Sequence, residues 1–398
     1  MSNKFRIKIP EGYFAVMQKV STKHLHPGMV LARNIFSTDG ILLLSADTVL
    51  NSTQIERLQH FNLPSVYIRN PLTDQLTDKD MLDTIPEVVR EETRVQAVQV
   101  VQTAFQNFSA NHRLESQPFK DTAEFLMKEV IENPGAMVHL TDIRTCDGYT
   151  FGHSVNVCVL STLTGIQLGY NRFQLKELSL GALLHDAGKM LIPKEILTKA
   201  GPLTVSERKS MEQHPTLGFD LLRRQRDIPL VSAHVAFQHH EKFNGTGYTR
   251  GLKGVHIHEY ARIVAIADVY DAITSDRPYK EGSLPHQAYE VMLSLANTHF
   301  DPIILRTFLN QIAIYPVGSI VRLTTGEIAV VTKVIPGLQT RPALKVIFDA
   351  SGSKLENGPE IDLAQQLTIF IDKVFTAAEV VKISLGNMYF NQSLRQAQ

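Results

Sequence analysis

The pattern of hydrophobic and polar positions divides the chain into parts of different character. Residues 1–75 hold short apolar or alternating runs that Pro-Gly and Asp-Gly pairs interrupt, and such pairs are turn signals. The runs at 29–32 and 40–44, a short helix at 52–61 and a strand at 65–68 indicate a small mixed α/β unit. This unit shows no pattern typical of chemistry, so we interpret it as a regulatory or packing domain.

A long helix is predicted over residues 86–112, because valines and phenylalanines recur there at steps of three and four and form one apolar stripe. The stripe favours a core face over a dimer seam, and the helix can also connect the first unit to the rest. A second helix, at 119–133, ends at the stop signal Asn133-Pro-Gly.

The middle of the chain, 136–315, has almost no strand pattern and predicts a succession of helices. The candidates are 152–168, 174–185, 205–225, 229–240, 258–275, 284–296 and 301–313.

The last section changes to β-rich runs at 319–323, 328–334 and 344–348, separated by turn signals. The expected fold class is therefore multidomain α+β, with a helical domain between a small α/β domain and a small β module. We place the domains at 1–115, 116–315 and 316–398, with the long helix at the end of the first.

The overall composition adds mainly exclusions. The 40 basic and 40 acidic side chains balance, which gives no charge pattern for gripping a long nucleic acid. Two cysteines, Cys146 and Cys158, make neither a disulfide framework nor a Cys-rich zinc site, and a reducing cytoplasm is the simplest setting. No apolar stretch is long enough to span a bilayer, and the N-terminus lacks the apolar segment of a signal peptide.

Candidate chemistry begins at His185-Asp186, which end the apolar run 178–184. A buried carboxylate needs a partner, which can be a metal ion or a neighbouring cation. The pair alone also fits a structural histidine and a helix-end aspartate. Asp268, which small apolar residues flank in 263–271, raises the same question.

Further histidines in the helical section strengthen the metal interpretation. His239 and His240 adjoin Glu241, and two such imidazoles would repel each other as cations without a ligand. His153 and His214 complete a set that could hold two divalent metals about 3.5–4 Å apart, an arrangement that activates water for phosphoryl transfer. Ligands that are all nitrogen or oxygen suit iron, manganese or zinc better than copper(I).

The motifs together resemble the HD-GYP domain, a branch of the HD phosphohydrolase superfamily. The matching pieces are His185-Asp186-Ala-Gly-Lys189, His239-His240-Glu241, Gly247-Tyr248, Asp268 and Asp276-Arg-Pro-Tyr-Lys280, and they cover roughly 140–315. The resemblance implies an all-helical fold, two or three metals, and hydrolysis of cyclic di-GMP or of the hybrid cyclic GMP-AMP.

By position, the resemblance implies one metal held by His153, His185, Asp186 and Asp268. It implies a second metal held by Asp186 as a bridge together with His214, His239 and His240. Iron or manganese is the expected metal, with zinc, nickel or magnesium as alternatives.

The resemblance also implies roles beyond the metals. Lys189 would steady the phosphate or protonate the leaving oxygen, and it can balance the carboxylates as well. Gly247 and Tyr248 would contact the substrate from the glycine loop, and Arg277 and Lys280 would grip phosphate oxygens.

Two departures from the family pattern matter. Thr249 stands where the signature has proline, which restores a backbone N–H and frees φ. Three-metal members have a glutamate one turn before the first histidine, whereas Tyr149 fills that slot here. We therefore expect two metals, with Asp147 as a helix cap or a substrate contact.

The leading interpretation is a metal-dependent phosphodiesterase that hydrolyses a cyclic dinucleotide to a linear dinucleotide with a hydroxide activated by two metals. One alternative is a catalytically weak receptor that binds the dinucleotide and signals through protein partners. Another is an HD phosphohydrolase acting on a different nucleotide. A homodimer, and a signalling partner such as a diguanylate cyclase, are the associations to consider.

Overall fold

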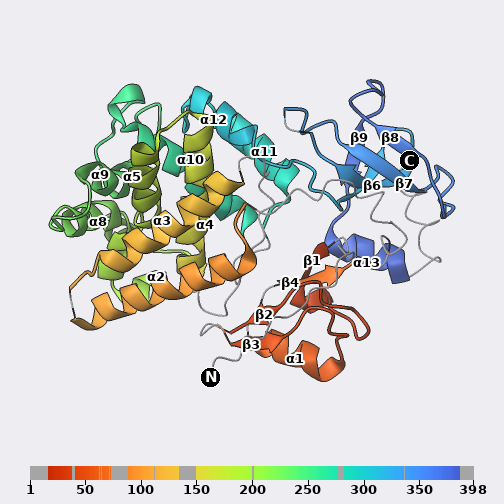
Figure 1. Cartoon of the computed structure of the whole chain (residues 1–398), viewed down its shortest axis with the longest axis horizontal. Coiled ribbons are helices and arrows are strands. Elements are labelled where there is room, and N and C mark those ends of the chain that lie inside the picture. The colour runs from red at the N-terminus through yellow and green to blue at the C-terminus, as the bar shows by residue number, and fades with distance from the viewer. Residues whose placement is uncertain are drawn as a thin grey trace.

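The structure, a computed structural model, describes residues 17–37, 41–61, 63, 65–70, 72, 88–111, 113–133, 149–199, 201–276, 282–335 and 337–385. Figure 1 shows a large helical part, a strand-containing N-terminal part and a C-terminal sheet. The predicted fold class is confirmed: a helical core is combined with N-terminal strands and a sheet of five strands.

The described residues of the N-terminal part form two small antiparallel sheets, the 3₁₀ turn η1 (Thr22–His24) and one α-helix. Strands β1 (Met17–Ser21) and β4 (Ser65–Arg69) pair with each other, and β2 (Ile35–Phe36) pairs with β3 (Leu42–Leu44). The run at 29–32 forms only isolated bridges, at Val30 and Leu31. Helix α1 (Ser52–His60) starts at a capping box. The Asn51 side chain accepts the Gln54 backbone N–H, and the Gln54 side chain accepts the Asn51 backbone N–H.

The N-terminal half of the helical part follows the predicted stripes. Helix α2 (Glu91–Asn111) starts later than predicted, and α3 (Gln117–Glu132) and α4 (Tyr149–Gln167) follow it. The buried apolar residues of α2 share one core with α3, α4 and the later helices, so the stripe is a core face. The sequence had grouped α2 with the first domain, and the proposed domain boundaries stay a prediction.

The second half consists of shorter helices. They are α5 (Arg172–Leu183), the 3₁₀ turn η2 (Ala187–Leu191), α6 (Lys194–Leu197), α7 (Val205–Met211), α8 (His214–Leu222), α9 (Leu230–Gln238), η3 (Gly254–His256), α10 (Glu259–Thr274), α11 (Pro285–Ser294) and α12 (Pro302–Leu309). Helix α10 is apolar on nearly every side because it lies inside the bundle, where α4 and α9 pack against it.

The single helix predicted at 205–225 is wrong. The segment forms two helices, and α8 begins anew at His214 with Pro215 in its first turn. Proline has no N–H to continue the helical ladder, and its ring clashes with the preceding turn. The break places His214 at a helix start.

The C-terminal sheet has the order β8-β7-β6-β5-β9, and every pairing within it is antiparallel. The predicted runs form β5 (Ile320–Leu323), β6 (Ile328–Lys333) and β7 (Ala343–Phe348), and the sequence analysis missed β8 (Glu360–Asp362) and β9 (Ile371–Val374). Strand β6 alternates toward two cores: Ala329 and Val331 face one, and Ile328 and Val330 face the other.

A final helix, α13 (Ala377–Leu385), was also missed. Val380 packs into the core of the sheet and Ala377 packs against the core of the N-terminal part. Figure 1 shows α13 between the two. Among the helices of the described residues, none has both the length and the hydropathy needed to cross a bilayer.

Candidate metal centre

The helical fold brings the predicted metal ligands together from five places in the chain. His153 lies on α4, His185 and Asp186 lie between α5 and η2, and Asp268 lies on α10. His214 begins α8, and His239 and His240 directly follow α9. Their ligand atoms form two groups: Asp186, His214, His239 and His240, and, beside them, His153, His185 and Asp268.

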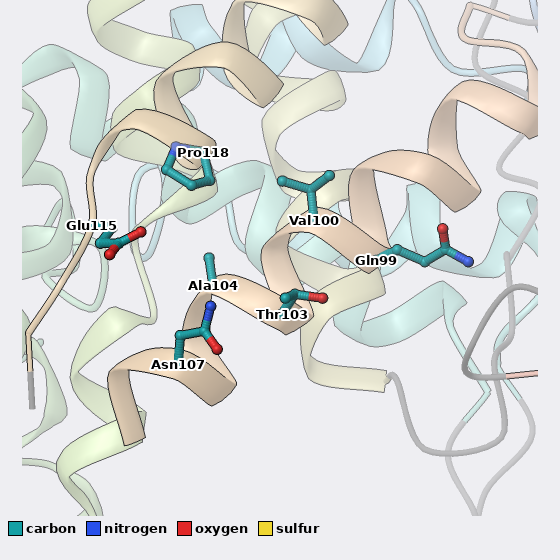
Figure 2. Close-up of a pocket in the computed structure, with 7 residues that line it drawn as sticks. All are labelled: Gln99, Val100, Thr103, Ala104, Asn107, Glu115 and Pro118. Carbon is teal, nitrogen blue, oxygen red and sulfur yellow. The ribbon is translucent and has the colours of Figure 1, made fainter. Parts of the chain in front are cut away.

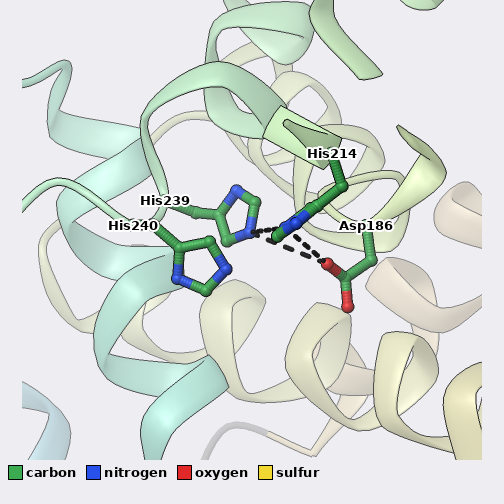
Figure 3. Close-up of side chains that lie close together, drawn as sticks. All are labelled: Asp186, His214, His239 and His240. Atoms are coloured by element: carbon green, nitrogen blue, oxygen red, sulfur yellow. Dashed lines mark hydrogen bonds and ion pairs between the residues drawn. The ribbon is translucent and has the colours of Figure 1, made fainter. Parts of the chain in front are cut away.

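Asp186 lies where the two groups meet. One of its carboxylate oxygens faces the imidazoles of its own group, and the other faces the imidazoles of the second group. Its Oδ1 is 3.3 Å from His214 Nε2 and 3.7 Å from His239 Nε2, as Figure 3 shows. Its Oδ2 is 3.3 Å from His185 Nε2 and 3.9 Å from His153 Nε2. A carboxylate in this position can bridge two cations.

In three of the clustered histidines, the second ring nitrogen fixes the tautomer. The Nδ1 atoms of His185, His214 and His239 lie 2.8, 2.7 and 2.9 Å from the carbonyl oxygens three residues earlier. A carbonyl oxygen only accepts, so each Nδ1 must donate its proton. The lone pair of each neutral ring therefore lies on Nε2, which is how proteins commonly orient metal-binding histidines.

These lone pairs point toward one another, an arrangement that a bound cation would stabilise. His214 Nε2 and His239 Nε2 are 3.3 Å apart, with no proton between them in these tautomers. Within the described part of the chain, the buried atoms His185 Nε2 and Asp186 Oδ1 have no hydrogen-bond partner. Buried polar atoms are rarely left in this state. The donor set fits divalent metals that accept imidazole and carboxylate ligands.

The protonation states of the residues around His214 favour the binding of cations. Burial lowers the pKa of His239 well below its usual value, and the neighbouring imidazoles lower it further, whereas Asp186 raises it. Burial likewise lowers the pKa of His240 to about 4. Burial opposes ionisation of Asp186, but Lys189 and His185 outweigh it and hold the pKa of this carboxyl well below its usual range. At neutral pH these rings are neutral and the carboxylate is ionised, which are the forms that bind metals.

His153 has a different environment. Burial disfavours its charged form, but hydrogen bonds to Asp268 and Asp271 raise its pKa to about 10. Its Nε2 is 3.1 Å from Asp268 Oδ1 and its Nδ1 is 2.7 Å from Asp271 Oδ2. Asp271 was missed in the sequence analysis, although it lies three residues after Asp268, a spacing that places both on one helix face.

Lys189 and Tyr248 border the centre. Lys189 Nζ is 2.5 Å from Asp186 Oδ2 and its side chain is 26 % exposed, so it also reaches solvent. The Tyr248 ring stacks on His240 with centroids 4.8 Å apart. Burial and nearby carboxylates raise the pKa of the Tyr248 phenol, which keeps it protonated as a hydrogen-bond donor.

The glycine loop is held by Glu241, whose role the sequence analysis did not recognise. Its buried carboxylate accepts the N–H groups of Arg250 at 2.7 Å and Leu252 at 2.9 Å. A Cβ on Gly247 would lie 2.3 Å from Lys242 N, so this close turn requires glycine.

Some predicted site residues fall outside the described part of the chain. Arg277, Lys280 and Asp147 lie outside the described residues, as does the side chain of Tyr149. The prediction of two metals rather than three depends on Tyr149 and Asp147 and stays a prediction.

A separate hollow lies on α2 and the start of α3 (Figure 2), and none of the clustered histidines lines it. It is lined by Gln99, Val100, Thr103, Ala104, Asn107, Glu115 and Pro118. These walls offer a single carboxylate and no imidazole, so we do not assign chemistry to this hollow.

Comparison with known proteins agrees with the geometry. An HD domain model matches residues 148–304, and a model for a KOW domain associated with the HD domain matches residues 320–383. A cyclic di-GMP phosphodiesterase of Pseudomonas aeruginosa is 38% identical over 250 residues, which cover 63% of this chain and 60% of that protein.

Two further relatives carry related names. A cyclic di-GMP phosphodiesterase response regulator of Xanthomonas campestris is 31% identical over 61% of this chain and 66% of its own length. A 3'3'-cGAMP-specific phosphodiesterase of Vibrio cholerae is 35% identical over 46% of this chain and 41% of its own length. The chain thus spans less than two thirds of each relative. Residues 148–304 match the HD domain family, as the resemblance to HD-GYP domains predicted.

Proposed function

We propose that this protein is a metal-dependent phosphodiesterase that hydrolyses a cyclic dinucleotide, cyclic di-GMP or 3',3'-cyclic GMP-AMP. The position of Asp186 supports this proposal most directly, because its two oxygens face two separate groups of imidazole nitrogens. The names of the relatives support the substrate class, since they include phosphodiesterases for both dinucleotides.

Two divalent metals, when bound, would supply a nucleophile from water and stabilise the negative charge that develops on the phosphate. His153, His185 and Asp268 would hold one metal, and His214, His239 and His240 the other, with Asp186 between them. Iron or manganese is the proposed metal, because nitrogen and oxygen donors without thiolate suit both.

Lys189 and Tyr248 would act on the substrate. The Lys189 ammonium contacts Asp186 and reaches solvent, so it can approach a phosphate oxygen or give a proton to the leaving oxygen. The protonated Tyr248 phenol can donate a hydrogen bond to the phosphate or to a base. Arg277 and Lys280 remain predicted phosphate contacts, in the segment after α10.

The proposal is tested with purified full-length protein loaded with Mn²⁺ or Fe²⁺ and offered each dinucleotide separately. We expect a linear dinucleotide as product. Asp186→Ala removes the carboxylate between the clusters and should lower turnover by about a hundredfold or more, since even indirect ligand contacts are worth about 10–100-fold. Asp220→Ala on α8, an exposed carboxylate paired with Arg223, is the matched control and should keep full activity.

Metal analysis of the same samples completes the test. We expect two metals per chain in the wild type and a deficit in Asp186→Ala. Near-normal turnover of Asp186→Ala would contradict the proposal. Tight dinucleotide binding without hydrolysis by the metal-loaded wild type would instead favour the receptor interpretation.

A further inference from the structure

A line of buried polar side chains leads from α2 to the metal centre. The Arg94 guanidinium on α2 donates to Asn156 Oδ1 on α4 at 3.2 Å. Asn156 Nδ2 donates to Asp271 Oδ1 on α10 at 2.8 Å. The second oxygen of Asp271 lies 2.7 Å from His153 Nδ1. Three helices thus contribute to one continuous hydrogen-bonded path that ends on a candidate metal ligand.

Burial makes this path energetically important. Arg94 is 2%, Asn156 7% and Asp271 1% exposed. Buried charges and amides are costly unless they are paired, and partly satisfied networks are worse than apolar cores. Arg94 and Asp271 carry opposite charges, and Asn156 connects them through its dipole. Each member therefore depends on the geometry of the next.

The chemistry of the groups determines which atom donates and which accepts each hydrogen bond along the path. A carboxylate only accepts, so Asp271 must receive a hydrogen on both sides, from Asn156 Nδ2 and from His153 Nδ1. Asn156 can present Nδ2 to Asp271 only if its oxygen faces away, and a guanidinium is the partner that suits this oxygen. Arg94 therefore selects the orientation of Asn156, which in turn holds Asp271.

The far end of the path reaches the start of α2. Arg94 Nε also donates to Val89 O at 3.3 Å, in the segment just before α2. Helix α2 packs on both α3 and α4. A shift of α2 along α4 would therefore move the guanidinium relative to Asn156 before it disturbed any direct ligand.

We propose that Arg94, Asn156 and Asp271 are positioning residues that fix the tautomer and orientation of His153, and that they link metal binding by the His153–His185–Asp268 group to the position of α2. The consequence for metal binding rests on the proposed function, whereas the orientation of the imidazole does not. Within the described residues, the path reaches the centre at His153, which hydrogen-bonds Asp268 and Asp271 and lies 3.9 Å from Asp186 of the other group, so the metal at the His153 group should respond more strongly than the other.

The test uses Arg94→Met, which keeps the length of the apolar stem and removes the donors. Val98→Ala, one turn later on α2 and equally buried at 2%, is the matched control because it shortens an apolar side chain and removes no hydrogen-bonding group. Nitrogen-15 histidine spectra of the metal-free protein report the His153 Nδ1–H proton, assigned with a His153→Gln variant. Mn²⁺ titration of wild type and variants then measures both metals, and Asp268→Asn identifies the metal held by the His153 group.

We expect Arg94→Met to shift or broaden the His153 Nδ1–H signal and to weaken the metal at the His153 group about tenfold, as for loss of other indirect ligand contacts. The other metal should keep its affinity, and Val98→Ala should leave both the signal and the affinities unchanged. An unchanged signal in Arg94→Met, or an equal change in Val98→Ala, would overturn the inference. If the wild type bound no Mn²⁺ while the signal still responded, the positioning would stand and the proposed function would fail.

Discussion

At the scale of the residue, the histidines of the centre differ in what their second ring nitrogen meets. His185, His214 and His239 each donate to a backbone carbonyl, whereas His153 meets the Asp271 carboxylate. A carboxylate stabilises an imidazolium and a carbonyl does so far less. Burial lowers the pKa of His239, whereas hydrogen bonds to Asp268 and Asp271 raise the pKa of His153, so these two rings titrate in opposite directions within one site.

This difference predicts how the stability of the metal-free protein depends on pH. The folded-state pKa of His240 is lowered to about 4 and that of His239 is lowered as well. Between pH 6.5 and 4 the unfolded chain binds protons at these rings that the folded chain does not, so stability falls as pH falls. His153 acts oppositely: its pKa is raised to about 10, so its contribution is complete below pH 6.5 and is lost as pH rises toward 10.

We therefore expect the metal-free protein to be most stable near neutral pH. Denaturant unfolding in a chelator at pH 7 and at pH 5 should show a loss of about 1–2 kcal/mol for His240 alone. The variant His240→Asn should show a smaller loss over the same interval. A wild type that is more stable at pH 5 than at pH 7 would contradict this assignment.

At the scale of the element, the contact between η2 and α8 joins two parts of the centre. η2 follows Asp186 and contains Lys189, and α8 begins with His214. The two elements approach so closely that a Cβ on Gly188 would lie 1.9 Å from His214 O and 2.5 Å from Gly218 N. Both obstacles are backbone atoms, which cannot rotate away as a side chain can.

Gly188→Ala should therefore push α8 away from η2 and separate His214 from Asp186. We expect a destabilisation of about 1–3 kcal/mol, as for other overpacked cores, together with loss of the metal held by the His214 group. Thermal unfolding and metal analysis measure the two effects.

Gly165→Ala on α4 is the control for this prediction. Its added Cβ would meet side-chain atoms of Leu178, Leu175 and Tyr170, at 2.8, 2.9 and 3.2 Å, and none of these residues belongs to the clustered histidines and aspartates. It should cost stability while retaining both metals. Full metal content in Gly188→Ala would show that α8 can accommodate the shift.

At the scale of the whole molecule, the sheet formed by β1 and β4 is hydrogen-bonded and ion-paired to the segment just after α10. Asp276, 7% exposed, accepts from Ser65 Oγ at 2.8 Å and pairs with Lys19 Nζ at 3.2 Å. It also accepts the Gly282 N–H at 2.6 Å. The same carboxylate thus joins strands β1 and β4 to both sides of the segment in which Arg277 and Lys280 are predicted to bind phosphate.

Asp276→Ala should loosen this connection. It removes the carboxylate that accepts from a hydroxyl, an ammonium and a backbone N–H, at a cost of about 1–3 kcal/mol. We expect faster hydrogen exchange in β1 and β4, measured by mass spectrometry. Asp47→Ala is the matched control, because the Asp47 side chain is 68% exposed in its pair with Arg69 and such pairs contribute little. Equal exchange in both variants would show that Asp276 does not hold the sheet.

The sequence by itself determined the helical centre and predicted the histidines and aspartates that meet there. Local signals were sufficient there. Apolar periodicity predicted the long helices, and the motifs around His185, His239 and Asp268 indicated the candidate metal ligands. Short strands such as β8 and β9 have too few residues for a periodic pattern, and α13 depends on contacts with two distant cores. Such elements are stabilised by tertiary packing, which a local pattern does not contain.

The tertiary structure alone decided which groups support the ligands. Pro215 was visible in the sequence, but only the packing of α8 on η2 shows why the helix breaks at His214. Arg94, Asn156 and Asp271 lie as far as 177 positions apart along the sequence, from 94 to 271, and share one buried path. Their roles come from the crossing of three helices, because a buried polar group takes its function from the partner that the fold places beside it.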